Sequence, residues 1–78
     1  MATSDSQQFP FFLTAALEQA EKLEREGSED ALRLATVMRQ YEATFRAWVV
    51  EGRPDTAPLI ISDFLTANRV VMDYLANR

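Results

Sequence analysis

The sequence predicts an all-α protein of three helices, in which the first two form an antiparallel helical hairpin and the third helix packs across it. Three observations support this fold class. Apolar residues recur at spacings of three and four, which is the period of an amphipathic helix. Glycine occurs only at Gly27 and Gly52, and each separates one helical pattern from the next. The chain has 78 residues, which is enough for one domain.

The first helix is expected from about Pro10 to Glu26. The polar residues 1–8 are interpreted as a disordered tail, which leaves residues 9–78 as the single helical domain. Proline suits a first helical turn because its missing N–H would have no partner there. Gly27 supplies the left-handed stop. The apolar face comprises Phe12, Leu13, Ala16, Leu17, Ala20 and Leu23.

The segment Phe9-Pro10-Phe11-Phe12 at the start of this helix allows two interpretations. It could be a short docking motif that inserts into another protein. It could also fold over the end of the bundle as a hydrophobic staple. We favour the staple, because three exposed phenylalanines would promote aggregation.

The second helix is expected from about Glu29 to Glu51, with Ser28 as its N-cap. Residues 1–30 contain seven acids and two bases, a net charge of −5, whereas residues 31–54 contain two acids and four arginines, a net charge of +2. An acidic helix beside a basic one favours antiparallel pairing. The apolar seam extends over almost three heptads and comprises Ala31, Leu34, Met38, Tyr41, Phe45 and Trp48.

The third helix is expected from about Ala57 to Ala76, with Thr56 as its cap. Its apolar stripe covers about half of the circumference, so one neighbouring helix cannot cover it. This helix is therefore either central or in contact with a second molecule. The stripe comprises Ala57, Ile61, Phe64, Asn68, Val71 and Leu75, widened by Ile60, Leu65, Ala67, Met72 and Tyr74. The predicted core is Leu34, Met38, Tyr41, Phe45, Phe64, Val71 and Leu75.

Asn68 falls near the middle of this stripe. A buried amide without partners costs about 1–3 kcal/mol, so a partner is expected. Asn68 could set the register of a contact between two molecules, as polar residues in heptad seams do. Alternatively, it could form a hydrogen bond within the monomer or lie at a wetter place near the end of the bundle.

Composition excludes several kinds of chemistry. Cysteine and histidine are absent, so the chain has no disulfide, no imidazole base and no zinc site of the usual kind. No base is placed to activate a serine, and no glycine-rich loop could bind phosphate. Glu18, Glu21 and Glu24 are interpreted as the solvated face of the first helix. We therefore expect no enzymatic activity, no cofactor and no metal.

The net charge of −4 argues against nucleic-acid binding, which requires a basic surface. No segment approaches the roughly 18 apolar residues of a membrane helix. The N-terminal residues do not follow the pattern of a signal peptide. A cytoplasmic location is the default expectation.

A homodimer is expected, because a chain this short buries only about 60% of its unfolded surface. Two further features could add to a binding surface. Trp48 and Val50 make the end of the second helix apolar on most sides, or are scattered surface residues. Arg39, Arg46 and Arg53 recur every seven residues and either bind an acidic partner or, as we favour, pair with acids of the first helix. The candidate protein-binding residues are Ile60, Ala67, Asn68, Val70, Tyr74, Trp48, Val50, Arg39, Arg46 and Arg53.

The sequence thus predicts a protein–protein interaction module that self-associates and acts as a chaperone, adaptor or regulator. In size, acidity and helical content the chain is similar to small bacterial chaperones and adaptors, a likeness that covers no motif. The alternative is a nucleic-acid-associated regulator whose arginine row contacts phosphate. A steep dependence of binding on salt would distinguish the alternative.

Overall fold

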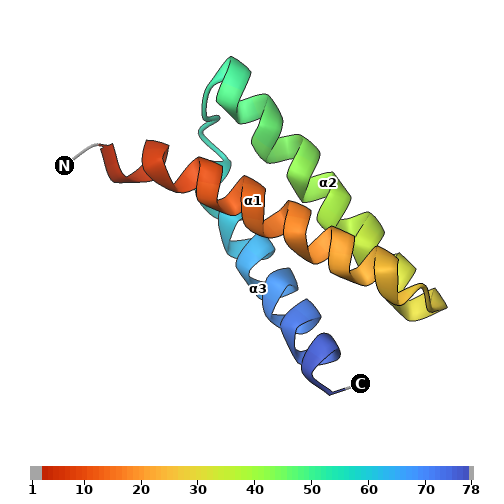
Figure 1. The fold of residues 1–78 in the computed structure, drawn as a ribbon. Coiled ribbons are helices and arrows are strands. Elements are labelled where there is room, and N and C mark those ends of the chain that lie inside the picture. Colours follow the sequence, from red (N-terminus) through yellow and green to blue (C-terminus); the bar gives the residue numbers. More distant parts are fainter. Residues whose placement is uncertain (1–2, 78) are drawn as a thin grey trace.

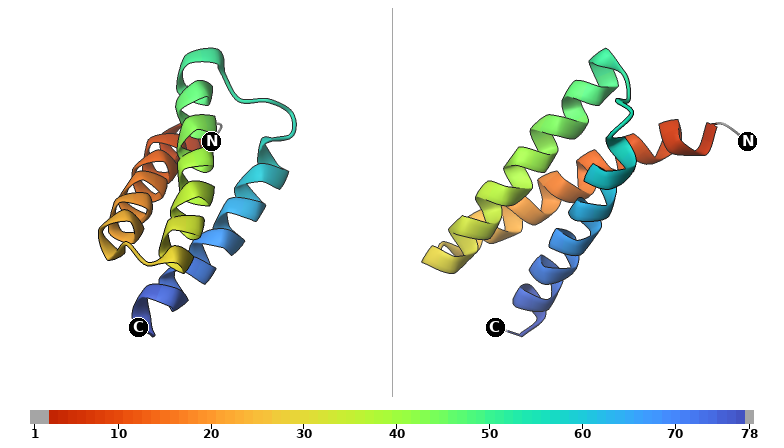
Figure 2. Two further views of the ribbon diagram at one scale, coloured as in Figure 1. Left: turned by 90° about the vertical axis from the view of Figure 1, so that its right-hand side faces the viewer. Right: turned by 180° about the vertical axis from the view of Figure 1, so that it is seen from behind.

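The computed structural model describes the backbone of residues 3–77 and the side chains of residues 10–77. It contains three helices, α1 (Thr3–Glu26), α2 (Glu29–Glu51) and α3 (Ala57–Ala76), and no strand within residues 3–77. α1 and α2 form an antiparallel hairpin, and α3 packs across both with fewer contacts (Figures 1 and 2). The predicted fold class is therefore confirmed.

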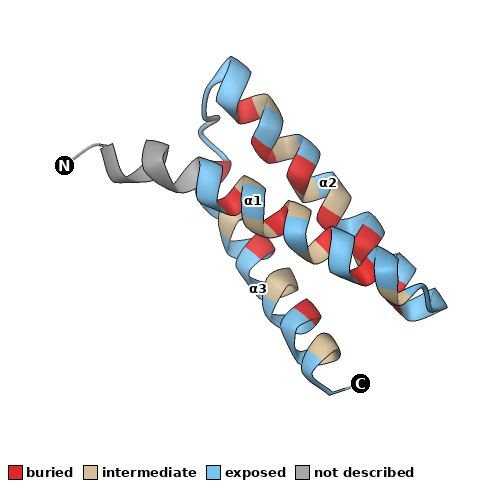
Figure 3. Cartoon of the chain, in the orientation of Figure 1, coloured by how far each residue is buried: buried red, intermediate tan, exposed pale blue. Residues whose placement is uncertain are grey.

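The α1–α2 hairpin packs closely because both helices place small side chains on their buried faces. Ala16 and Ala20 of α1 and Ala31 and Ala35 of α2 all belong to the buried core. The distance between helix axes depends on the side chains at the contact, and alanine permits a short one. Figure 3 shows that the buried residues follow the faces along which the helices meet.

Both ends of α2 are determined by local sequence. Ser28 Oγ accepts a hydrogen bond from the Ala31 N–H at 3.2 Å, which is the expected N-cap. The Gly52 N–H donates to the Trp48 carbonyl at 2.9 Å. Gly27 and Gly52 have φ angles of +78° and +100°, a region that glycine enters without steric cost. The predicted bounds of α2 and both glycine stops are confirmed.

α1 begins at Thr3, so the prediction of a start near Pro10 is wrong. Pro10 lies inside the helix rather than in its first turn. An interior proline removes one helical hydrogen bond and crowds the carbonyl four residues before it, at a cost of about 3 kcal/mol. That cost favoured a start at Pro10, and the structure continues the helix through it. The turns before Pro10 project past the crossing with α3 (Figure 1). The division into a tail at 1–8 and a domain at 9–78 stays a prediction.

α3 has the predicted bounds, but the side chain of Thr56 does not cap it. Thr56 occupies the N-cap position, and its side chain forms no capping hydrogen bond. Pro58 at the second helical position has no N–H to offer. The next N–H, that of Leu59, already donates to the Thr56 carbonyl at 3.1 Å. The two natural donors for a threonine cap are thus missing or occupied.

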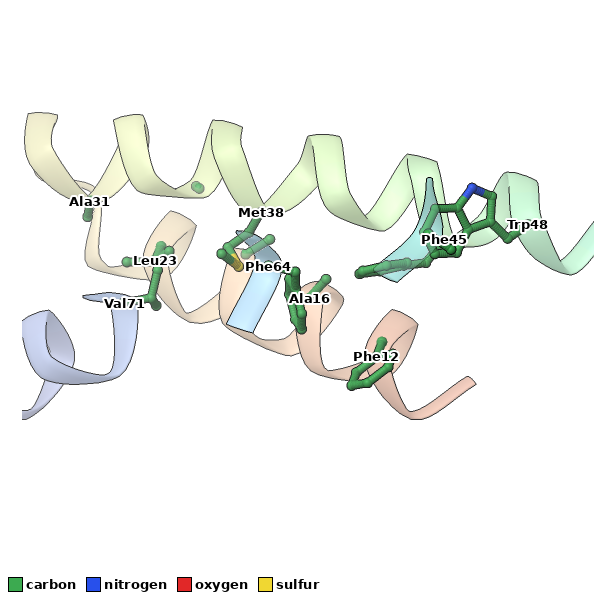
Figure 4. Close-up of a cluster of buried hydrophobic side chains, with 12 residues drawn as sticks. Phe12, Ala16, Leu23, Ala31, Met38, Phe45, Trp48, Phe64 and Val71 are labelled. Atoms are coloured by element: carbon green, nitrogen blue, oxygen red, sulfur yellow. The ribbon is translucent and has the colours of Figure 1, made fainter. Parts of the chain in front are cut away.

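An aromatic cluster joins all three helices (Figure 4). The ring of Phe45 on α2 meets Phe64 on α3 at a centroid distance of 5.1 Å and Phe12 on α1 at 5.8 Å. Tyr41 lies 5.3 Å from Phe64. Such tilted pairs contribute about 0.5–1.5 kcal/mol each beyond the burial of their area. The cluster is therefore a main attachment of α3 to the hairpin.

The predicted core is confirmed, with some members at its edge. Met38, Phe45, Phe64 and Val71 are fully buried. Leu34, Tyr41 and Leu75 are half-buried and pack against the buried cluster.

The phenylalanine segment at the start of the predicted first helix is divided. Phe12 is buried against Phe45 and Phe64, whereas the neighbouring Phe11 is exposed. The side chain of Phe9 lies outside the described residues.

Candidate protein-binding site

Three of the predicted contact residues lie on one edge of α3 and already pack against the chain itself. Ile60, Ala67 and Tyr74 are half-buried and touch the core cluster. The hydroxyl of Tyr74 also lies 2.8 Å from Ser28 Oγ at the start of α2, within hydrogen-bond distance. Val70 is 51% exposed and is not part of that packing. The role of these residues in a dimer stays a prediction.

A second apolar row occupies the other side of the buried residues of α3. Leu65 and Met72 are 50% and 55% exposed, and Pro58, seven residues before Leu65, is exposed as well. In the sequence, Leu65 and Met72 only widened the stripe of the third helix. The sequence nevertheless contains a pattern that indicates this row. Spacings of 3, 4, 3, 4 and 3 define an outer seam, which comprises Pro58, Ile61, Leu65, Asn68, Met72 and Leu75.

Asn68 lies at the boundary between the outer seam and α1. Its Oδ1 accepts a hydrogen bond from Gln19 Nε2 at 3.1 Å. Its Nδ2 lies 3.5 Å from the sulfur of Met72, which is a weak acceptor. The structure therefore places a hydrogen bond of Asn68 within the monomer, one of the two alternatives for this residue.

The Gln19–Asn68 amide pair is incompletely satisfied. Gln19 Oε1 is buried and has no hydrogen-bond partner among the described residues. An asparagine amide carries two N–H donors, and among the described residues those of Asn68 meet the Met72 sulfur, in a contact exposed to solvent. The Gln19 oxygen therefore has unused hydrogen-bonding capacity beside the outer seam. Such buried atoms are few in folded proteins, which makes this junction unusual.

The arginines of α2 form a cluster of ion pairs with two glutamates. Arg39 donates from Nε and Nη2 to the two oxygens of Glu24 on α1, at 2.9 and 2.7 Å. Its Nη1 donates to Glu42 Oε1 at 2.8 Å, and Arg46 donates to Glu42 Oε2. A two-pronged arginine–carboxylate pair is among the stronger surface interactions. Arg39 thus pairs with an acid of the first helix, as the favoured interpretation expected.

The predicted row of three arginines does not continue along the helix. α2 ends at Glu51, so Arg53 lies in the connection to α3 and only Arg39 and Arg46 remain on one helical edge. The reason is that Gly52 stops the helix before the third position of the row.

Glu42 was missed by the sequence reasoning, although it is the buried centre of this cluster. The signal was its spacing of three residues from Arg39 and four from Arg46, which places all three on one helical edge. The hydrogen bond from Arg39 lowers the pKa of Glu42 below its ordinary value of 4.5, and the bond from Arg46 adds to this effect against the opposing effect of burial. The bond from Arg39 also lowers the pKa of Glu24. Both carboxylates are therefore ionised at neutral pH. Glu24 joins α1 to α2 through Arg39, whereas Glu42 holds Arg39 and Arg46 in place along α2.

The end of α2 does not form one apolar surface. Trp48 is buried and packs edge-to-face on Phe45 at 5.3 Å, because it continues the inward seam of the helix. The placement of Trp48 in the apolar seam of the second helix is therefore confirmed, and its role in protein binding stays a prediction. Val50 is 83% exposed, and Val49 is exposed as well.

Neither a metal centre nor a membrane span is found in the described part of the chain. No three acidic side chains among the described residues come together in a way that could hold a metal ion. Within the same residues, no helix is long and apolar enough to cross a bilayer. Comparisons with protein-family models, with curated proteins and with solved structures found no match to this chain.

Proposed function

We propose that the protein is a non-enzymatic protein–protein interaction module that acts through the exposed side of α3. One observation carries the proposal. α3 packs across the hairpin through one side and leaves several large apolar side chains in solvent, namely Leu59, Leu65, Val70 and Met72. Leu65 and Met72 lie one heptad apart on one edge of the helix, whereas Leu59 and Val70 lie on the other edge of its exposed side. Exposed apolar side chains that lie together on a folded monomer commonly mark a site of protein binding, and Leu65 and Met72 form such a row.

The proposed role is that of a small acidic chaperone, adaptor or regulator in the cytoplasm. α3 is suited to this role because its two sides have different tasks. One side holds the fold through Phe64 and Val71, and the other offers Leu65 and Met72 to a partner. A partner helix or groove would recognise residues spaced three and four apart, as in helix-in-groove complexes.

The proposal is tested by capture of a partner on the immobilised full-length chain. Lysate of the source cell is applied at about 50 mM and about 200 mM salt, a range over which phosphate contacts weaken strongly. We expect a protein to be retained at both concentrations by the parent chain and by Arg33→Ala, a variant of an exposed residue away from α3. Met72→Asp should lose that protein. Equal retention on Met72→Asp and the parent would contradict the proposal.

The alternative, a regulator that binds nucleic acid through α2, has one supporting observation. The side chain of Arg46 is well exposed beside Arg39. However, both guanidinium groups already donate to Glu24 or Glu42, so phosphate would have to displace a carboxylate. This role would require binding that falls steeply with salt and is lost in Arg46→Ala.

A further inference from the structure

We propose that the outer seam of α3 is the contact between two copies of this chain, related by a two-fold axis that passes beside Asn68. This inference rests on the proposed function, because it names the occupant of the surface described there. It differs from the dimer contact expected from the sequence, which lay at Ile60, Ala67, Val70 and Tyr74. Ile60, Ala67 and Tyr74 pack against the hairpin of their own chain, and so do Ile61 and Leu75 of the outer seam. The contact between copies is therefore centred on Leu65 and Met72, the exposed large apolar residues of the seam.

The pattern of the outer seam is that of a helix–helix contact. Its six residues follow heptad spacing from Pro58 to Leu75. These 17 residue steps correspond to about 26 Å of helix. Leu65 and Met72 project into solvent at half or more of their surface, on either side of Asn68. A second helix with the same pattern would insert its own Leu65 and Met72 between them.

The amide of Asn68 favours a second copy over an unrelated partner. Its Oδ1 accepts one hydrogen bond from Gln19 and has a second lone pair, while its Nδ2 faces Met72 on the outer seam. An asparagine is both donor and acceptor, so two asparagines related by a two-fold axis satisfy each other. Identical residues meet in this way only at a symmetric contact between copies.

Charge around the outer seam also favours self-association. Each copy has a net charge of −4, so most faces of two copies repel each other. The positions of α3 that flank the outer seam on its solvent side are Ser62, Arg69 and Ala76, which carry one positive charge, and the nearest acid on the helix is Asp73. Two acidic chains therefore approach at least electrostatic cost through this face.

The available area indicates the strength of the contact. A standard interface buries about 800 Å² on each partner, with about 20–30 residues a side, whereas the outer seam has six residues. A single helical face about 26 Å long provides an interface at the small, reversible end of the range. Because each monomer already has its own core, we expect folded monomers and dimers in exchange, with dissociation at micromolar concentrations.

The decisive experiment compares two variants of equal exposure on α3. Leu65 is 50% exposed on the outer seam, and Val70 is 51% exposed outside it. The mass of the full-length parent, Leu65→Asp and Val70→Asp is measured by sedimentation from about 10 µM to about 1 mM, a range that spans weak dimerisation. We expect the parent and Val70→Asp to reach twice the monomer mass and Leu65→Asp to remain monomeric, with unchanged helicity by circular dichroism.

Cysteine cross-linking provides an independent readout, since the chain contains no cysteine. A two-fold axis beside Asn68 brings the same position of both copies together, and a disulfide forms when Cα atoms lie about 4.4–6.8 Å apart. Asn68→Cys should give a covalent dimer under mild oxidation. Val50→Cys, which is more exposed, should not at the same concentration.

Three outcomes would overturn the inference. They are a monomeric parent at about 1 mM, dissociation by Val70→Asp but not by Leu65→Asp, and faster cross-linking at position 50 than at position 68. None of them refutes the proposed function, which fails only if Met72→Asp retains every captured protein that the parent retains.

Discussion

Gln19 of α1 donates a hydrogen bond to Asn68 of α3, and this single amide–amide bond spans 49 positions of the sequence at 3.1 Å. It occurs at a junction with few contacts, between two helices that also meet through Phe12 and Phe64. The bond therefore fixes α3 on the hairpin at one point, while one buried oxygen of the same amide stays without a partner among the described residues.

The first prediction concerns this amide pair. Gln19→Leu and Asn68→Leu should each lower the free energy of unfolding by about 1–3 kcal/mol, because each leaves one amide without its partner. The double variant should be close to the parent, since an apolar pair has no hydrogen bond to lose. Denaturation by urea at low micromolar concentration measures all four proteins. Additive losses in the double variant would show that the two amides do not interact in solution.

The second prediction concerns the aromatic cluster. Phe45→Ala and Phe64→Ala should each cost about 3–5 kcal/mol, because a large side chain is removed from a buried site. That is a large part of the stability of a small domain, so both variants should be mostly unfolded at room temperature. Phe11→Ala is the matched control, and its exposed ring should change stability by less than about 0.5 kcal/mol. Circular dichroism during heating distinguishes these results.

The third prediction concerns acid stability. The pKa of Glu42 is lowered in the folded protein, so its ionised form stabilises the fold above the ordinary pKa of 4.5, and this contribution is lost as the pH falls through the lowered pKa. Glu42→Gln cannot lose a charge and should show a smaller decrease in melting temperature below pH 4.5 than the parent.

The control for this experiment is Glu29→Gln, which removes a well-exposed ion pair with Arg33 at 3.8 Å. Exposed ion pairs contribute little to stability, so the melting temperature of Glu29→Gln should fall below pH 4.5 as steeply as that of the parent. If the melting temperature of Glu42→Gln falls with pH as steeply as that of the parent, carboxylates other than Glu42 control unfolding in acid.

The fourth prediction separates two roles of Ser28. Its Oγ caps α2 by accepting from Ala31 and also lies 2.8 Å from the Tyr74 hydroxyl. Ser28→Ala should lower stability by about 0.5–2 kcal/mol, as the loss of an N-cap does. Tyr74→Phe removes only the hydroxyl contact and should cost less. Equal losses, measured by urea denaturation, would show that the cap contributes nothing beyond the contact with α3.

The parts of the fold that depend on local sequence could be predicted. Ser28, Gly27 and Gly52 act through their own backbone and their nearest neighbours, so the bounds of α2 follow from them. The start of α1 could not be predicted in this way. Pro10 is most favourable in a first turn, yet the structure continues the helix through it.

The candidate site depends on how the helices are oriented, which local patterns do not contain. The sequence showed a wide apolar stripe on the third helix. Which edge of that stripe is covered depends on the angle at which α3 crosses the hairpin, and the structure covers the edge of Ile60 and Ala67 rather than that of Leu65 and Met72. Glu42 was missed for a similar reason. α2 has a neighbour on each of two sides, so its buried face is wider than one apolar seam.

The small residues on the hairpin also restrict how this protein can change over evolution. Ala16, Ala20, Ala31 and Ala35 allow α1 and α2 to approach closely, and any larger side chain there would force the two helices apart. Leu65 and Met72 carry no such constraint, because the fold does not enclose them. New specificities can therefore arise by substitution on the solvent side of α3 while these four hairpin positions stay small.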